Sequence, residues 1–260
     1  MILRRVTEHV REQNWTAVGI DFCIVVIGVF IGIQVSNWND ERDTNRQAAL
    51  FTEHLRADLR EEAWGYQYLI EYSRDVLAAS EATVNALSGK TTLSDEALLV
   101  SAYRASQYKN RARRRGTYDE LISTGTIGLI RSQALRETAM RVYNIATIEW
   151  LVREGLESRY REAFRMAVSN DVQRALNRDC GDRYVEVGDY EGIADIIDYP
   201  CKLGVPQAQI AEAAGALRAD PALVPLLRKR IADLDTRLHD LIVNNQDIVK
   251  GLHDIAGERS

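Results

Sequence analysis

The sequence contains little proline, little cysteine and no excess of basic charge. Only 4 of its 260 residues are proline, whereas folded proteins usually contain ~5%. So few helix breakers permit long uninterrupted helices and argue against an all-β sandwich. The 33 basic and 38 acidic residues give a formal net charge of −5, so electrostatics offers no case for nucleic acid as a partner. The hydrophobic share of 46% and the charged share of 27% exclude wholesale disorder.

One long apolar run lies near the N-terminus. Residues 17–35 read AVGIDFCIVVIGVFIGIQV, and as a helix they would span ~28 Å, close to the ~30 Å of a bilayer's hydrocarbon core. The strongly polar Asp21 and Gln34 lie near its ends, where side chains can reach lipid headgroups. The alternatives are a cleaved signal peptide and a buried helix of a soluble protein. No A-x-A-like pattern of small residues follows the run, which argues against cleavage, so we expect an uncleaved span.

The charges that flank the run predict its orientation. Three arginines precede it and two follow it closely, and the positive-inside rule places the more basic side in the cytoplasm. We therefore expect a single-pass protein of the inner (cytoplasmic) membrane with the lipid bilayer as its partner. The expected parts are a cytoplasmic tail (1–15), a transmembrane helix (16–37) and an extracytoplasmic helical domain (38–260).

The cysteines give a second indication of compartment. Cys23 lies in the apolar run, which leaves Cys180 and Cys201 as the only pair in the rest of the chain. An even pair that brackets an irregular segment is typical of a disulfide in an oxidising compartment. The alternative is two unpaired thiols at a chance spacing.

The pattern beyond the run predicts an all-α fold, an elongated antiparallel helical bundle with coiled-coil character. Apolar residues recur at steps of three, four and seven from Phe51 to Leu87, which predicts one helix over 39–88 that continues the span and ends at Gly89. Caps and turn residues predict helices over 95–108, over 118–125 behind a capping box at Thr117 and Glu120, over 132–178, over 206–219, and from a start signal at Asp220-Pro221 to the C-terminus. Residues 179–205 read as an irregular loop with a short extended piece at 184–187.

The last helix carries a regular apolar seam. Steps of four and three connect Leu227, Ile231, Leu234, Leu238, Leu241, Asn245, Ile248, Leu252 and Ile255. We expect this seam to pack within its own subunit, and the alternative is an intermolecular coiled coil. Asn245 is the polar member of the seam, a position that often fixes register or pairing.

Two segments resemble an uncharacterised family of bacterial single-pass membrane proteins, a domain of unknown function. The first is IVVIGVFIGIQ (24–34) running into NWNDER (37–42), and the second is TYDELISTG (117–125) with Leu129-Ile130 and Leu135-Arg136. The resemblance implies an N-terminal anchor and a helical extracytoplasmic region, and it transfers no activity. The family often has Glu where this chain has Asp21, and two asparagines where it has Ser36-Asn37.

One face of the expected span carries small residues. Gly28, Gly32 and Ser36 follow at intervals of four, and Asp21 falls within about 20° of the same face at 100° per residue. Small residues let helices approach closely, and a polar group can bond across the contact. We expect this face to associate with a second copy or with another membrane protein. The alternative is that the glycines are incidental and Asp21 reaches the headgroups.

A basic cluster and three histidines are candidate sites. The cluster is Lys109, Arg111, Arg113, Arg114 and Arg115, and it reads as a solvated connector or as an anion contact, with the connector preferred. His54, His239 and His253 read as surface residues, so no metal or cofactor is expected.

No catalytic motif accompanies these features. The sequence has no nucleophile elbow, Walker loop or dinucleotide-binding fingerprint. We therefore expect a membrane-anchored structural or adaptor protein that acts by helix association, and no enzyme. The alternative is an extracytoplasmic ligand-sensing bundle that signals through a separate membrane partner.

Overall fold

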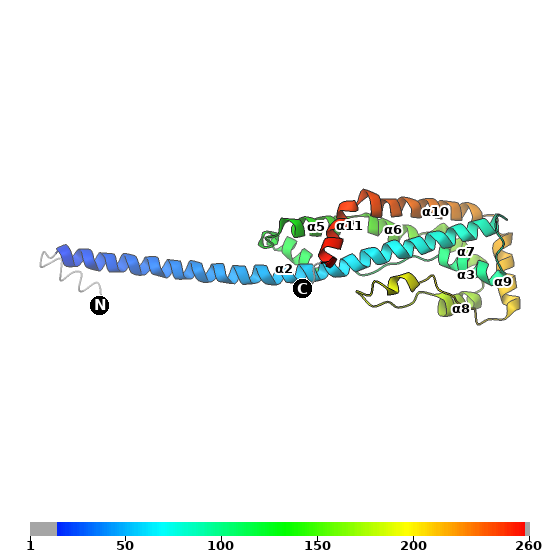
Figure 1. The fold of residues 1–260 in the computed structure, drawn as a ribbon, viewed down its shortest axis with the longest axis horizontal. Coiled ribbons are helices and arrows are strands. Elements are labelled where there is room, and N and C mark those ends of the chain that lie inside the picture. Colours follow the sequence, from blue (N-terminus) through cyan, green and yellow to red (C-terminus); the bar gives the residue numbers. More distant parts are fainter. Residues whose placement is uncertain (1–14, 258–260) are drawn as a thin grey trace.

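One helix runs through the whole molecule in the computed structural model, which describes residues 15–257. This helix, α2 (Trp15–Leu87), stands alone over its first part and then enters the bundle (Figure 1). Its buried residues begin at Ala48. It ends as predicted: Gly89 has a φ of +72° and the N–H of Lys90 donates to the carbonyl of Asn85 at 2.9 Å, which is a Schellman motif.

The remaining elements are short helices and turns. They are α3 (Asp95–Ala105), α4 (Gly116–Ser123), η1 (Ile127–Leu129), α5 (Gln133–Asn144), α6 (Thr147–Leu156), α7 (Arg159–Ala167), α8 (Asn170–Cys180), η2 (Gly192–Asp195), α9 (Gln207–Ala219), α10 (Leu223–His239), η3 (Asp240–Asn244) and α11 (Gln246–Gly257). No strand occurs within residues 15–257, including the expected extended piece at 184–187. The all-α prediction is confirmed.

Two apolar cores lie along α2. The core nearer the free part of α2 joins side chains between Leu55 and Val76 to α4, α5, α11 and the end of α10. The core at the far end joins α3, α7, α8, α9 and the start of α10. Helix α10 runs antiparallel along α2 and reaches both cores (Figure 1), so α2 and α10 form the frame on which the shorter helices are held.

The long helix predicted over 132–178 is wrong, because the chain turns three times within it to give α5, α6, α7 and α8. Ser132 caps α5 as predicted, but Ser158 also accepts an N–H, that of Arg161, and starts α7. A single straight helix would bury the apolar residues along its one side against one set of neighbours. Here α5 packs on α2 and α11, whereas α7 packs on α3, α9 and α10.

Three predicted helix ends also differ. Helix α3 stops at Ala105 instead of 108, and α10 begins at Leu223, two residues beyond Pro221. The capping box at Thr117 does not form: α4 already begins at Gly116 and has no side-chain cap. Instead the carboxylate of Asp58 in α2 accepts the N–H of Thr117 at 3.2 Å, so a tertiary contact replaces the local cap.

Candidate functional site

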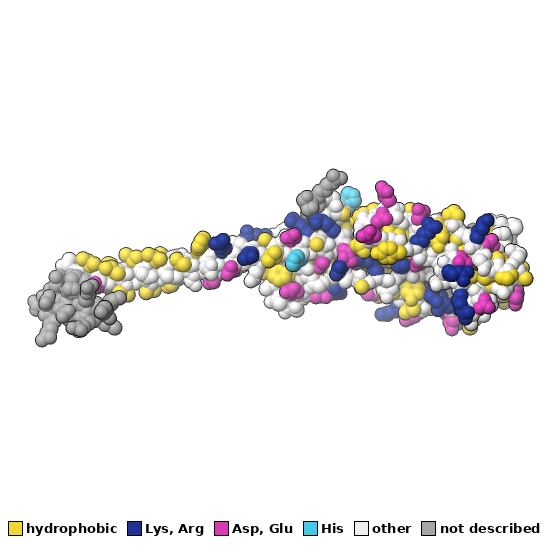
Figure 2. Space-filling model, turned by 90° about the horizontal axis from the view of Figure 1, so that it is seen from below, with side chains coloured by type: hydrophobic (Ala, Val, Ile, Leu, Met, Phe, Trp, Pro, Cys, Tyr) yellow, Lys and Arg dark blue, Asp and Glu magenta, His cyan; other side chains and the backbone are white. Residues whose placement is uncertain are grey.

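The first part of α2 presents apolar side chains to its surroundings. Phe22 is 69% exposed, Phe30 is 61% exposed, and the large apolar side chains between them are exposed as well. On the face that Figure 2 shows, an acidic side chain lies at the start of this stretch, and no charged side chain follows until a band of mixed charge precedes the bundle. The apolar stretch of α2 has a mean hydropathy of 2.4, and none of it is buried inside the protein. By length and composition, α2 could therefore cross a membrane. Residues 1–14 of the expected tail lie outside the described residues.

The small-residue face lies on this free part of α2. Gly28, Gly32 and Ser36 belong to one uninterrupted helix, as does Asp21. A Cβ at Gly28 or Gly32 would meet nothing within 4 Å. Gly28, Gly32 and Ser36 are exposed, and no other helix within residues 15–257 covers them, so this part of the face is open to lipid or to another protein.

The basic cluster is an ion-paired connector. The preferred interpretation of a solvated connector holds for the exposed Arg114 and Arg115, and it is wrong for Arg111 and Arg113, whose side chains are 20% and 11% exposed. The segment 109–115, here called the arginine connector, crosses α2 between α3 and α4. Arg111 and Arg113 both contact Glu62 of α2, at 3.2 and 2.9 Å. Arg114 pairs with Glu61, Arg115 with Asp119 and Lys109 with Asp182.

Glu62 is the centre of this connector. Its side chain is 3% exposed, and its carboxylate also accepts the backbone N–H of Arg114 at 2.9 Å. Gly65 lies one turn further along α2, and a Cβ there would collide with the guanidinium of Arg111. The absence of a side chain at Gly65 therefore lets the connector lie flat against the helix.

Lys109 continues the connector over an aromatic surface. Its Nζ lies 5.6 Å from the ring centres of Tyr68 and Tyr72 and 2.8 Å from Asp182. Burial raises the pKa of the Tyr72 hydroxyl, and that hydroxyl donates to Asp182 at 3.0 Å. Burial lowers the pKa of Lys109, but hydrogen bonding to Asp182 and Tyr68 outweighs it and the pKa is raised. These aromatic residues are therefore packing and hydrogen-bonding groups.

The seam of the last helix is buried inside the subunit. Leu227, Leu234, Leu241 and Leu252 are at most 3% exposed, and α10 and α11 both pack on α2. The single predicted helix is wrong, because the π-helical turn η3 and Asn245 separate α10 from α11. The extra residue of a π turn lets the chain change direction while the seam still faces α2.

Asn245 lies at that change of direction. Its backbone is non-helical, and its Nδ2 donates to the carbonyl of Asp240 at 2.6 Å. The hydroxyl of Tyr66 in α2 donates to the carbonyl of Leu241 at 2.8 Å. The polar seam residue thus makes its side-chain hydrogen bond to the backbone of the π turn.

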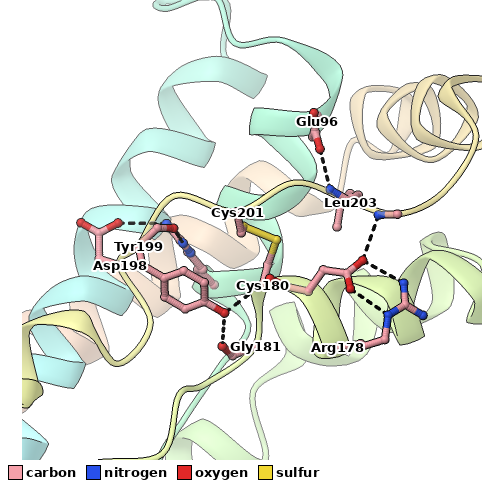
Figure 3. The surroundings of a disulfide bond; sticks show 11 residues. Glu96, Arg178, Cys180, Gly181, Asp198, Tyr199, Cys201 and Leu203 are labelled. Atoms are coloured by element: carbon pink, nitrogen blue, oxygen red, sulfur yellow. Dashed lines mark hydrogen bonds and ion pairs between the residues drawn. A yellow bond between two sulfur atoms is a disulfide. The ribbon is translucent and has the colours of Figure 1, made fainter.

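A disulfide joins Cys180 and Cys201, whose Cα atoms are 5.5 Å apart. Around it, Tyr199 donates to the carbonyl of Gly181 at 2.7 Å, and Leu203 donates its N–H to Glu96 of α3 at 2.6 Å (Figure 3). The bond therefore fastens the loop 181–206 to the end of α8 and, through Glu96, to α3. Cys23, the remaining cysteine, is an exposed free thiol.

The three histidines of the described residues lie on the surface, as predicted. His54, His239 and His253 are all exposed. Within residues 15–257, no group of three or more His, Cys, Asp or Glu residues is arranged to hold a metal ion.

Sequence reasoning found the basic cluster but missed its pairing with Glu61 and Glu62 of α2. The sequence contains both the basic run and the acidic pair Glu61-Glu62. Their opposite charge is the only feature of the sequence that could have indicated the pairing. About 50 residues separate them, and no local spacing rule brings such distant segments together.

The comparisons with known proteins give a family and no activity. No curated protein and no solved structure matches the chain. The model of a family of unknown function (DUF6090) matches residues 21–157, which include most of the apolar run, the arginine connector and both segments quoted for the resemblance. Because the match covers just over half of the chain, the protein belongs to this family.

Proposed function

We propose that the protein is a single-pass protein of the inner membrane that acts by binding, as a structural or adaptor protein. One observation carries the proposal. The free part of α2 exposes about 20 residues of almost purely apolar surface, and the same helix continues without a break into the bundle core. Exposed to water, that surface would cost about 25 cal/mol for each Å². Lipid or another helix removes this cost.

The orientation rests on charge and on the disulfide. The arginine bias before the run favours a cytoplasmic N-terminus. The bond between Cys180 and Cys201 suits an oxidising compartment on the opposite side. In this arrangement α2, about 110 Å long at 1.5 Å per residue, carries the bundle outward from the membrane.

Binding is proposed to use the span, because the seam of α10 and α11 is occupied inside the subunit. The small-residue face of Gly28, Gly32 and Ser36, with Asp21 two turns earlier, is the surface at which a second span can approach closely. The partner is a second copy or a different membrane protein.

Membrane insertion is tested by alkaline carbonate extraction of vesicles that contain the full chain. Retention of the protein in the membrane pellet is expected, and its release would contradict the proposal.

Orientation is tested with a membrane-impermeant maleimide on intact cells after reduction. Labelling of Cys201 from outside is expected, and labelling only after the inner membrane is opened would contradict the orientation.

Association is tested in a membrane two-hybrid assay with Gly28→Ile and Gly32→Ile combined. Two branched side chains should hold the helices apart and reduce the signal at least fivefold. Gly19→Ile is the matched control, since Gly19 lies about 180° from Gly28 around the helix at 100° per residue and is equally free of contacts. An unchanged signal in the double variant, or an equal loss in the control, would refute association through this face.

A further inference from the structure

A cleft opens beside the disulfide, between α2, α3 and the loop that contains Cys201. Its volume is about 520 Å³, within the range of ~300–1,000 Å³ that small-molecule sites occupy. Alanines of α2 and apolar residues of α3 form the floor, namely Ala78, Ala79, Ala82, Ala97 and Val100. Polar groups line the rim, namely Asp75, Glu96, Ser101, Arg104, Asp198 and Lys202.

The donors of Arg104 are already used within the chain. Its Nη1 pairs with Asp198 at 2.9 Å and its Nη2 donates to the carbonyl of Tyr199 at 2.5 Å. Figure 3 shows Asp198 and Tyr199 side by side on the loop that leads to the disulfide. The Nε of Arg104 is enclosed by the protein, and no hydrogen bond from the described residues engages it. This side chain therefore forms a wall of the cleft and leaves little for an anion to bind.

The N-terminus of α3 is equally occupied. Its first turn carries Asp95 and Glu96, which offset the positive end of the helix dipole. The Oγ of Ser94 accepts the N–H of Ala97, and Ser101 is hydrogen-bonded to the carbonyl of Ala79 at 3.0 Å. The neutral polar groups of the cleft thus have partners already.

Asp75 is the unmatched group. It is half-buried on α2 at the edge of the alanine floor, and within residues 15–257 no hydrogen bond or ion pair engages its carboxylate. Glu96 adds a second carboxylate, whose Oε1 accepts only a backbone N–H. The cation that remains, Lys202, lies on the exposed part of the rim.

We propose that this cleft binds a small aliphatic ammonium ion, with the charged nitrogen at the Asp75 carboxylate and the hydrocarbon part on the alanine floor. A cation is favoured over an anion because Nη1 and Nη2 of Arg104 already have partners within the chain, whereas the carboxylate of Asp75 has none among the described residues. An aliphatic body is favoured because methyl and isopropyl groups of α2 and α3 form the floor, while the one aromatic ring among the lining residues, that of Tyr199, already carries the guanidinium groups of Arg104 and Arg183. The site lies far from the free part of α2 and goes beyond the proposed anchoring role.

The electrostatics of Asp75 agree with this arrangement. Burial first, and then the nearby Asp198 and Glu71, raise its pKa to about 6, while Arg104 acts in the opposite direction. Glu96 and Lys202 are the other charged groups that line the cleft. A bound ammonium would supply the positive charge that this carboxylate lacks.

The test uses the full chain in nanodiscs of zwitterionic lipid and ligand-observed saturation-transfer NMR. The probes are n-butylammonium, n-butanol and butyrate, which share a four-carbon body and differ in charge. Butylammonium should bind at least tenfold more tightly than butanol, and butyrate should bind no better than butanol. A stronger signal from butyrate than from butylammonium would show that the cleft prefers anions. Equal signals from all three probes would show that it is only an apolar surface. Either result overturns the proposal.

Asp75→Asn should remove the preference for butylammonium, because the amide keeps the shape and loses the charge. Glu81→Gln is the matched control: Glu81 is an exposed acid of the same helix that does not line the cleft. Ala82→Phe fills the floor at an exposed position and should weaken butylammonium binding independently of charge. A preference that survives in Asp75→Asn, or that Glu81→Gln also abolishes, overturns the assignment.

Discussion

The carboxylate of Glu62 accepts a 2.9 Å hydrogen bond from Nε of Arg113, although 51 positions separate the two residues in the sequence. The same carboxylate contacts Arg111 and the backbone of Arg114. A single buried acid on α2 therefore fastens the arginine connector to the helix that holds the bundle together.

We predict that Glu62→Gln lowers stability by about 3 kcal/mol, because removing one partner leaves buried guanidinium groups without their counter-charge. Thermal unfolding of the full chain in mild detergent, followed by circular dichroism, should show a Tm lower by roughly 6–12 °C. Asp171→Asn is the control. Its ion pair with Arg174 is more than 70% exposed on both sides and should contribute less than about 0.5 kcal/mol. Similar losses in the two variants would contradict a special role for Glu62.

The hydroxyl of Tyr66 should stabilise the π turn. In Tyr66→Phe the carbonyl of Leu241 loses its donor, and an unsatisfied buried carbonyl costs about 1–3 kcal/mol. Tyr184→Phe removes a hydroxyl from a side chain that is 91% exposed and should change nothing. Hydrogen exchange of the amides in residues 240–248 should accelerate only in the Tyr66 variant, and unchanged exchange would show that the turn holds without it.

The disulfide should stabilise the bundle by about 3 kcal/mol, since it closes a loop across 21 residues. The double variant Cys180→Ala, Cys201→Ala should therefore have a Tm lower by roughly 6–12 °C, which is what about 3 kcal/mol corresponds to in a protein of this size. A maleimide-polymer gel shift of the denatured protein should count one free thiol, Cys23, before reduction and three after it. Three reactive thiols in unreduced protein isolated from cells would contradict the bond.

Asp75 should make stability depend on pH. Its pKa of about 6 in the folded protein lies above the ordinary value of 3.8, so the folded state holds this proton more tightly than the unfolded chain. Stability from this group is therefore present at low pH and is lost as the pH rises from about 4 through about 6. Asp75→Asn should raise the Tm at pH 8 and leave it unchanged at pH 4. A gain of equal size at both pH values would show that the carboxylate is not the cause.

Local rules predicted the elements whose signals lie within a few residues. The stop at Gly89, the caps at Ser94 and Ser132, and α9 after Pro206 all follow the sequence closely. The same rules failed at Thr117, where Asp58 of a distant helix supplies the cap. They also failed at Ser158, where a second cap signal inside an apolar stripe starts a new helix.

The sequence by itself determined the apolar run, the continuous helix behind it and the all-α class, because hydrophobicity and helical period are properties of neighbouring residues. The tertiary structure alone decided that the seam of α10 and α11 faces inward, that the basic cluster pairs with Glu61 and Glu62, and that a cleft forms beside Cys201. Each of these depends on which distant segments share a surface. Charge pairing and burial depend on the distance between side chains in space, and the spacing of residues along the chain does not determine that distance for segments far apart in the sequence.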